Sequence, residues 1–174
     1  MMVSWILLTM IACVDVNYGA AEVVAACVGI RDWADDVPYV ERVVRATEAP
    51  APYVPGQFYL REMPWIVRIL ESLTDIDLIV IDGYVWLAKD RPGLGVHLYE
   101  NLAGRFPVVG VAKGAFHNND CAIPVTRGES TRPLYITAIG IDAGLAAEGI
   151  ARMAGLHRMP VILKRVDQLT RGTA

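Results

Sequence analysis

The sequence predicts an α/β fold built on a mixed β-sheet, and two patterns in it support this. Near the start of the chain, three apolar segments follow one another with only short polar turns between them, which is typical of an antiparallel meander. Further along, a helical pattern alternates with short apolar segments, which predicts parallel strands joined by helices. Because 54% of the 174 residues are hydrophobic and 20% are charged, the chain can bury a core and is not a disordered one.

The predicted meander occupies the first quarter of the chain. A segment rich in Ile, Leu and Val ends at an Asn-Tyr-Gly turn, a second apolar segment ends at a polar turn, and a third alternates apolar and polar residues. Such segments bounded by turn residues are typical of strands. The predicted strands are residues 5–16, 21–30 and 39–46.

A proline-rich loop over residues 47–56 leads into a predicted helix over residues 58–73, where apolar residues recur at helical spacing. Pro64 lies inside this pattern. Because proline is tolerated in the first turn of a helix but not in its interior, we expect the helix proper to begin near residues 61–63.

The remaining segments alternate between the two types. The pattern predicts strands at residues 77–82, 106–112, 122–125 and 134–139, a loop at 90–95, short helices at 96–103 and 142–154, and a last helical or irregular segment at 159–169. Asp142 is a candidate N-cap, and residues 122–125 and 134–139 are expected to pair across a polar loop. An antiparallel three-strand meander followed by parallel strands and flanking helices is the RNase H-like arrangement, which we expect as one domain over residues 1–174.

Composition limits the classes of function. The net charge is −3 and the isoelectric point is near 5.6, which argues against a protein that holds nucleic acid by bulk charge. A local basic groove with bound metal ions would still permit a nuclease. The mean hydropathy of +0.36 fits buried parallel strands, or an apolar surface through which copies of the chain associate.

Three cysteines, at positions 13, 27 and 121, have no CxxC spacing, so neither a disulfide framework nor a zinc knuckle is indicated and a cytoplasmic location is expected. Residues 1–14 are apolar but lack a basic start and a cleavage site, so we interpret them as part of the first strand and not as a signal peptide. The segment is also too short to span a bilayer, and no membrane partner is expected.

Carboxylates lie at informative points of the predicted sheet. Asp15 falls late in an otherwise apolar strand, and Asp82 ends the strand at residues 77–82. In such sheets, binding and catalytic residues lie at the carboxyl ends of the strands. Two neighbouring carboxylates there repel each other unless a cation lies between them. Glu62, near the predicted helix start, is placed to face the same point. Alternatively, Asp82 belongs to a common Asp-Gly turn, and Glu62 is a first-turn acid that complements the helix dipole.

Several further motifs follow one another over nearly the whole chain. They are VDVNY at residues 14–18, PYVPG at 52–56, FYLREMP at 58–64, DLIVIDG at 77–83, PVVGVAK at 107–113 and LHRMPVILKRVD at 156–167, together with a helix histidine, His97. In their kind and order these motifs resemble those of a known family, endonuclease V, the deoxyinosine-directed nuclease.

The resemblance implies roles for these positions. Asp15 and Asp82 would bind Mg²⁺, or Mn²⁺ in its place, directly, and Glu62 would bind it directly or through water. Asp167 would complete the cluster or position the attacking water, and Lys113 would contact a phosphate or the product. The wedge that fills the gap left by a displaced base, and the adjoining substrate contacts, would come from Tyr53, Val54, Pro55, Gly56 and Gly83. The partner would be DNA or RNA.

The chain departs from the family after its second aspartate. The family has Asp-Gly-His-Gly and then a His-Pro-Arg run, whereas this chain has Tyr84 and Val85 in place of the His and the second Gly, and it lacks the His-Pro pair. The family's later Gly-His segment is also missing. Because Val85 and Trp86 are expected to add bulk where backbone would meet a flipped base, deoxyinosine specificity stays open. Three hypotheses follow: an inosine-directed endonuclease, a metal-dependent relative with another nucleic-acid substrate, and a non-catalytic binding protein on the same fold.

Several weaker signals have two interpretations each. Lys113 would contact the substrate or simply reach solvent, and Asp167 would be a ligand or part of a solvated face. Residues 117–120 (HNND) form a ligand set or, more simply, a polar turn. Trp86 is a stacking platform or core packing. The basic residues near the C-terminus form a nucleic-acid groove or a solvated helix face: Arg152, Arg158, Lys164, Arg165 and Arg171.

Overall fold

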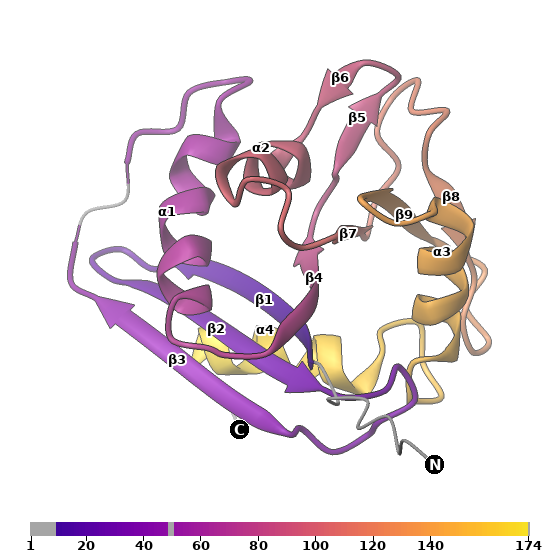
Figure 1. The fold of residues 1–174 in the computed structure, drawn as a ribbon, viewed down its shortest axis with the longest axis horizontal. Coiled ribbons are helices and arrows are strands. Elements are labelled where there is room, and N and C mark those ends of the chain that lie inside the picture. Colours follow the sequence, from indigo (N-terminus) through magenta and orange to yellow (C-terminus); the bar gives the residue numbers. More distant parts are fainter. Residues whose placement is uncertain (1–9, 49–50, 174) are drawn as a thin grey trace, which may run out of the picture.

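The computed structural model describes residues 10–48 and 51–173. One mixed sheet has the strand order β3-β2-β1-β4-β7-β9-β8, and a separate two-stranded ribbon pairs β5 with β6 (Figure 1). The strands are β1 Met10–Tyr18, β2 Val23–Ile30, β3 Val40–Ala46, β4 Ile76–Asp82, β5 Trp86–Ala88, β6 Arg91–Pro92, β7 Val108–Ala112, β8 Ile123–Val125 and β9 Leu134–Ile139. The helices are α1 Phe58–Leu70, α2 Leu94–Asn101, α3 Ala143–Arg152 and α4 Val161–Arg171.

The pairing confirms the predicted mixed sheet. β1, β2 and β3 form an antiparallel meander, and β1, β4 and β7 are parallel neighbours. β9 then runs antiparallel to both β7 and β8, so the predicted pairing of the last two strands is also confirmed. Because β1, β4 and β7 run in the same direction, their carboxyl ends meet at one edge of the sheet.

Helices cover both faces of the sheet (Figure 1). One apolar core lies between the sheet and helices α1 and α2, and the other lies between the sheet and helices α3 and α4. Side chains of β1 alternate between these cores: Ala12 and Val14 belong to the first, and Ile11 and Cys13 belong to the second. The same alternation places Ile81 in the first core and Val80 in the second, as expected for strands buried on both faces.

The expected start of the first helix was wrong. α1 begins at Phe58, so Pro64 lies in its interior and Glu62, its fifth residue, is not a first-turn acid. Pro64 and Leu60 are both on the exposed side of α1. Water can therefore bind the Leu60 carbonyl that has no amide partner at Pro64, which lowers the cost of an interior proline.

Other boundaries differ by a few residues, and one small element was missed. The predicted loop at residues 90–95 contains β6 and the start of α2, and β5 precedes it. With three and two residues, β5 and β6 are too short to carry an alternating pattern, and the sequence does not reveal them. The last segment is a helix, α4, and Asp142 caps α3 as predicted, since its Oδ1 accepts a hydrogen bond of 3.0 Å from the Leu145 amide.

Residues 5–9 of the predicted first strand and residues 49–50 of the predicted loop lie outside the described residues. In the part of the chain that is described, no helix combines the length and the apolar character needed to cross a bilayer.

The segment between α3 and α4 is held by a buried arginine. Arg127 is only 6% exposed, and its guanidinium donates to the backbone carbonyls of His157 (2.9 Å), Arg158 (3.3 Å), Gly155 (3.3 Å) and Met153. Five N–H donors in a planar fork make arginine suited to collecting several carbonyls at once. A loop without regular structure is thereby fixed against the sheet.

Replacing this side chain should destabilise the protein. Arg127→Ala leaves these carbonyls without a partner in a buried place, so we expect the free energy of unfolding to fall by about 3 kcal/mol. Urea or thermal unfolding followed by circular dichroism measures this change. Arg132→Ala is the matched control because the Arg132 side chain is exposed on the same loop. Equal stability of the two variants would show that the carbonyl contacts contribute little.

Candidate active site

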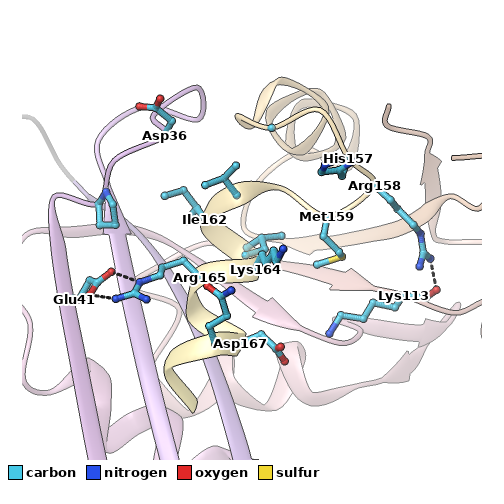
Figure 2. Close-up of a pocket in the computed structure, with 15 residues that line it drawn as sticks. Asp36, Glu41, Lys113, His157, Arg158, Met159, Ile162, Lys164, Arg165 and Asp167 are labelled. Atoms are coloured by element: carbon cyan, nitrogen blue, oxygen red, sulfur yellow. Dashed lines mark hydrogen bonds and ion pairs between the residues drawn. The ribbon is translucent and has the colours of Figure 1, made fainter. Parts of the chain in front are cut away.

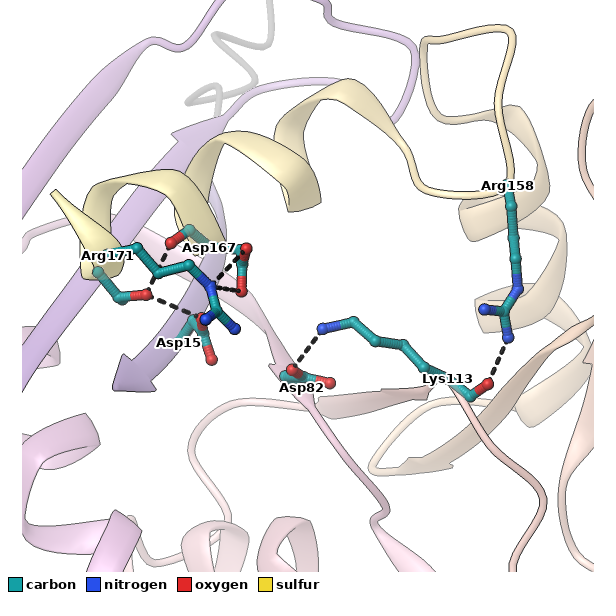
Figure 3. A network of polar contacts seen from close by, with 7 residues as sticks. Asp15, Asp82, Lys113, Arg158, Asp167 and Arg171 are labelled. Carbon is teal, nitrogen blue, oxygen red and sulfur yellow. Dashed lines mark hydrogen bonds and ion pairs between the residues drawn. The ribbon is translucent and has the colours of Figure 1, made fainter. Parts of the chain in front are cut away.

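Two aspartates lie side by side at the carboxyl edge of the sheet. Val14 of β1 pairs with Ile81 of β4, so Asp15 and Asp82 are the next residues along two parallel neighbours. Because side chains alternate along a strand, both carboxylates point to the face that α4 covers (Figure 3). Together with residues of α4, they line one small hollow.

Helix α4 adds Asp167 and Thr170 to this edge. Thr170 Oγ1 lies 3.2 Å from Asp15 Oδ2 and 2.8 Å from the Asp167 carbonyl oxygen. A hydroxyl has one hydrogen, so it donates to one of these oxygens at a time. Arg171 Nε donates to both carboxylate oxygens of Asp167 at 3.0 Å. Sequence patterns gave no reason to single out Thr170, and Arg171 entered only as one of several basic residues.

Lys113, directly after β7, reaches into the same cluster. Its Nζ lies 2.9 Å from Asp82 Oδ2, so its side chain contacts the acids and does not simply extend into solvent. Its backbone carbonyl accepts a hydrogen bond from Arg158, which lies in the segment before α4 (Figure 3). The position of Lys113 is therefore fixed from both ends.

Glu62 approaches from the opposite face, on α1. Its side chain is 8% exposed, and the pKa of Glu62 is raised to about 8, first by burial and then by the charges of Asp15 and Asp82. Burial is also the main reason that the pKa of Asp15 is raised to about 6, followed by the charges of Asp82 and Asp167. Each of the three acids predicted from the sequence thus lies within electrostatic reach of the others.

The donor atoms fit a hard divalent cation, because clustered carboxylate oxygens are what Mg²⁺ binds and a cation would relieve their repulsion. As the side chains lie, however, no three His, Cys, Asp or Glu residues within 10–48 and 51–173 stand together closely enough to hold an ion. Lys113 and Arg171 neutralise Asp82 and Asp167 instead. The metal site stays a prediction.

A second hollow, of about 310 Å³ and lined mostly by apolar residues, adjoins Asp82 on the side of α1. Two of the residues predicted to contact substrate, Gly56 and Gly83, line it. Tyr53 and Val54, of the predicted wedge, are 62% and 46% exposed in the loop before α1. The other lining residues come from α1, the turn after β4, the β5–β6 ribbon, the start of α2 and the segment after β7: Phe58, Tyr59, Tyr84, Leu87, Arg91, Pro92, Gly93, Leu94 and Phe116.

The expectation that Val85 and Trp86 add bulk to this hollow was wrong. Neither residue lines it. Val85 is fully buried and packs on Gly95. A Cβ atom added at Gly95 would lie only 2.5 Å from the Val85 side chain. Trp86 packs against the core and its Nε1 donates to the Ala138 carbonyl at 3.2 Å, so it is core packing and not an exposed stacking platform. The wall that departs from the family is formed by Tyr84 and Leu87.

Tyr84 fixes the opposite rim of the hollow. Its hydroxyl donates to the Gly114 carbonyl at 2.7 Å and accepts from the Phe116 amide at 3.0 Å. The Tyr84 and Phe116 rings meet edge to face with their centroids 6.0 Å apart. A tyrosine in place of the family's histidine therefore joins the turn after β4 to the segment after β7.

Two weaker signals have structural explanations. Residues 117–120 form a turn in which the Asn119 side chain donates to the Trp86 carbonyl at 2.8 Å and accepts from the Cys121 amide at 3.0 Å. His97, on α2, stacks on Tyr59 with ring centroids 3.6 Å apart. It therefore supports one of the residues that line the apolar hollow.

Comparison with known proteins gives a consistent result. The sequence model of the endonuclease V family matches residues 3–163. The chain is 31% identical to an endonuclease V of Nocardia farcinica, with 92% of this chain and 79% of that protein covered. It is 29% identical to one of Streptomyces coelicolor, over 91% of this chain and 76% of that protein.

Solved structures agree in fold. The crystal structure of an endonuclease V from Streptomyces avermitilis superposes with a TM-score of 0.74 at 27% identity, covering 95% of this chain and 81% of that one. An endonuclease V of Ciona intestinalis, solved in complex with a 24mer DNA that contains an inosine followed by a ribo-adenosine, gives a TM-score of 0.76 at 16% identity, over 97% and 87% of the two chains.

The raised pKa values predict a pH-dependent stability. Ordinary carboxyl pKa values are about 4, so between pH 4 and about 8 the unfolded chain releases protons that Asp15 and Glu62 still hold when folded. The contribution of these two carboxyl groups to stability is therefore fully present at low pH and is lost as pH rises through this window. We expect the melting temperature, measured in EDTA, to fall between pH 5 and 8.

Glu62→Gln should reduce this fall and raise the melting temperature at pH 8 by about 3 °C. Glu71→Gln, which changes an exposed glutamate at the end of α1, should behave like the unmodified protein. A melting temperature that is flat with pH, or that falls equally in both variants, would contradict the raised pKa values of Asp15 and Glu62.

Proposed function

Because the chain belongs to the endonuclease V family, we propose that it is a divalent-metal-dependent endonuclease that hydrolyses a phosphodiester near a deaminated or otherwise distorted base in DNA or RNA. The observation that carries this proposal is that Asp15 and Asp82 lie side by side with Glu62 within electrostatic reach, so that neighbouring charges add to burial in raising the pKa values of Asp15 and Glu62. Buried like charges are costly, and a bound cation would compensate for them.

The proposed ligands are Asp15 and Asp82, with Glu62 binding directly or through water. When bound, Mg²⁺ or Mn²⁺ would polarise a phosphate oxygen and lower the pKa of a bound water. Asp167 lies beside Asp15, held by Arg171, and is placed to orient a water at the same edge. Lys113 is the cation nearest Asp82, and it would bind the phosphate that the acids alone would repel.

The adjoining hollow would hold the altered base. Its volume of about 310 Å³ and its aromatic lining suit an unstacked nucleobase, which is recognised by stacking and by its polar edge. The exposed Tyr53 and Val54 precede this hollow in the chain, as expected for a wedge that replaces the displaced base. That a relative of the same fold has been solved with DNA containing inosine supports inosine as the first base to test.

A second candidate is a metal-dependent nuclease of different base preference. It is favoured by Tyr84 and Leu87, which line the hollow where the family has another sequence. The Tyr84 hydroxyl is already used by two backbone groups, so it offers little to a base edge.

Cleavage of labelled strands tests the proposal. Strands that carry one deoxyinosine, one inosine or no lesion are incubated with Mg²⁺ or Mn²⁺. We expect a cut close to the inosine, lost on addition of EDTA, and reduced by about 100-fold or more in Asp82→Ala, because a direct ligand is removed. Asp77→Ala is the control, since Asp77 is exposed on the same strand.

Each outcome separates the hypotheses. Metal-dependent cutting without preference for inosine would support the second candidate. If no strand is cut by folded protein, the chain is a binding protein on this fold, and the nuclease proposal fails.

The two hydrogen bonds of the Tyr84 hydroxyl, which we call the Tyr84 latch, lead to a separate prediction. Tyr84→Phe keeps the ring but removes the bonds to Gly114 and Phe116, so the rim of the hollow loosens. We expect kcat/KM on the preferred strand to fall at least about five-fold, because the net contribution of even one of these two hydrogen bonds is about 1 kcal/mol. Tyr39→Phe, at an exposed position before β3, should leave kcat/KM unchanged. An unchanged value for Tyr84→Phe as well would mean that the latch does not shape the substrate site.

A further inference from the structure

A third hollow, of about 750 Å³, lies along α4 (Figure 2). Its walls are α4, the segment before α4, and the start of β3 with the turn that precedes it. We call it the α4 groove. It is not part of the site described above, and most of its residues have no role in the proposed chemistry.

The α4 groove is continuous with the acids. Lys113 and Asp167 line both this groove and the small hollow that contains Asp15 and Asp82. On the other side, Asp82 also lines the apolar hollow next to α1. A nucleic-acid strand with one phosphate at the acids would therefore reach the apolar hollow in one direction and the α4 groove in the other.

The groove is locally basic in a protein whose net charge is −3. Most of its cations already have partners. Arg165 binds Glu41 at 2.7 Å, Lys113 binds Asp82, and Arg158 donates to the backbone carbonyls of Arg132, Pro133 and Lys113. Arg165 and Lys113 thereby neutralise acids that would repel a polyanion.

Lys164 is the exception. It is exposed at the centre of the groove (Figure 2) and forms no ion pair with any of the described residues. The exposed His157 lies on the same wall. An unpaired ammonium beside the acid site is a free phosphate contact, and phosphate contacts supply most of the affinity for nucleic acid.

The groove also offers apolar surface. The half-buried Met159 and Val161, which is 43% exposed, line it among the charged residues. Cations that track a backbone, with apolar surface for sugars and bases, are the usual features of a single-strand channel. Asp36 lies at the far end (Figure 2), which limits the favourable stretch to the part between Lys113 and Lys164.

We propose that the single strand of the substrate that continues past the scissile phosphate lies in the α4 groove and that Lys164 contacts one of its phosphates. This inference rests on the proposed nuclease function. It adds a strand-binding site on the side of α4, separate from the base hollow on the side of α1.

Binding is measured without cleavage, in EDTA, by the fluorescence anisotropy of a labelled single strand made as DNA and as RNA. We expect Lys164→Glu to raise Kd about ten-fold and to lower the slope of log Kd against log salt by about one. Arg68→Glu is the control because it makes the same change of charge at an exposed position on α1, on the opposite face. It should change Kd by less than about two-fold, and melting curves verify that both variants are folded.

A shortened strand that ends at the cut site lacks the part that would enter the groove. It should have the same Kd for Lys164→Glu as for Arg68→Glu. On a cleavable strand, Lys164→Glu should raise KM and leave kcat unchanged, because Lys164 does not touch the reacting atoms. Equal Kd values for Lys164→Glu and Arg68→Glu on every strand would overturn the groove assignment. This result differs from failure of the nuclease proposal, in which strands bind in a Lys164-dependent way and are never cut.

Discussion

Repulsion among carboxylates at one edge of the sheet is the constraint on which the rest of the site depends. The parallel register of β1 and β4 brings Asp15 and Asp82 together, and α1 adds the buried Glu62 from the other face. Nothing in packing requires three acids here, and burial keeps two of them partly protonated near neutral pH. The surrounding residues compensate for part of this repulsion: Lys113 binds Asp82, Arg171 binds Asp167, and Thr170 lies against Asp15.

These compensating residues are themselves positioned by backbone contacts. Arg127 gathers the carbonyls of the segment between α3 and α4, and Arg158 in that segment binds the carbonyl of Lys113. One connected network of hydrogen bonds thus joins the irregular segment before α4, which forms a wall of the α4 groove, to Lys113 beside Asp82. Rigid support of this kind is what a site needs when charges have to be held in place against their own repulsion.

Much of this arrangement was predictable from the sequence, and the limits have physical causes. The strands and their mixed pairing follow from apolar segments and short turns. Asp15 and Asp82 follow from their places late in one of those strands and at the end of another. The start of α1 was missed because the cost of an interior proline depends on whether solvent reaches the carbonyl of Leu60. Arg127, Thr170 and the Tyr84 latch act through contacts between residues far apart in the chain, which periodicity does not reveal. Val85 points into the core because of the path of the turn after β4, which residue type alone does not determine.

The ion pair between Lys113 and Asp82 gives the protein a counterion of its own. Any divalent cation that reaches Asp82 has to compete with a tethered ammonium at 2.9 Å, so the acids are not simply an open receptor for metal. A tethered charge that is displaced stays close by, since the backbone of Lys113 is held by Arg158. The displaced ammonium would then be the nearest partner for a phosphate arriving at the same edge. Entry of the proposed metal and entry of the substrate would in this way be coupled through one side chain, and the protein would hold such a metal less firmly without substrate than with a bound strand.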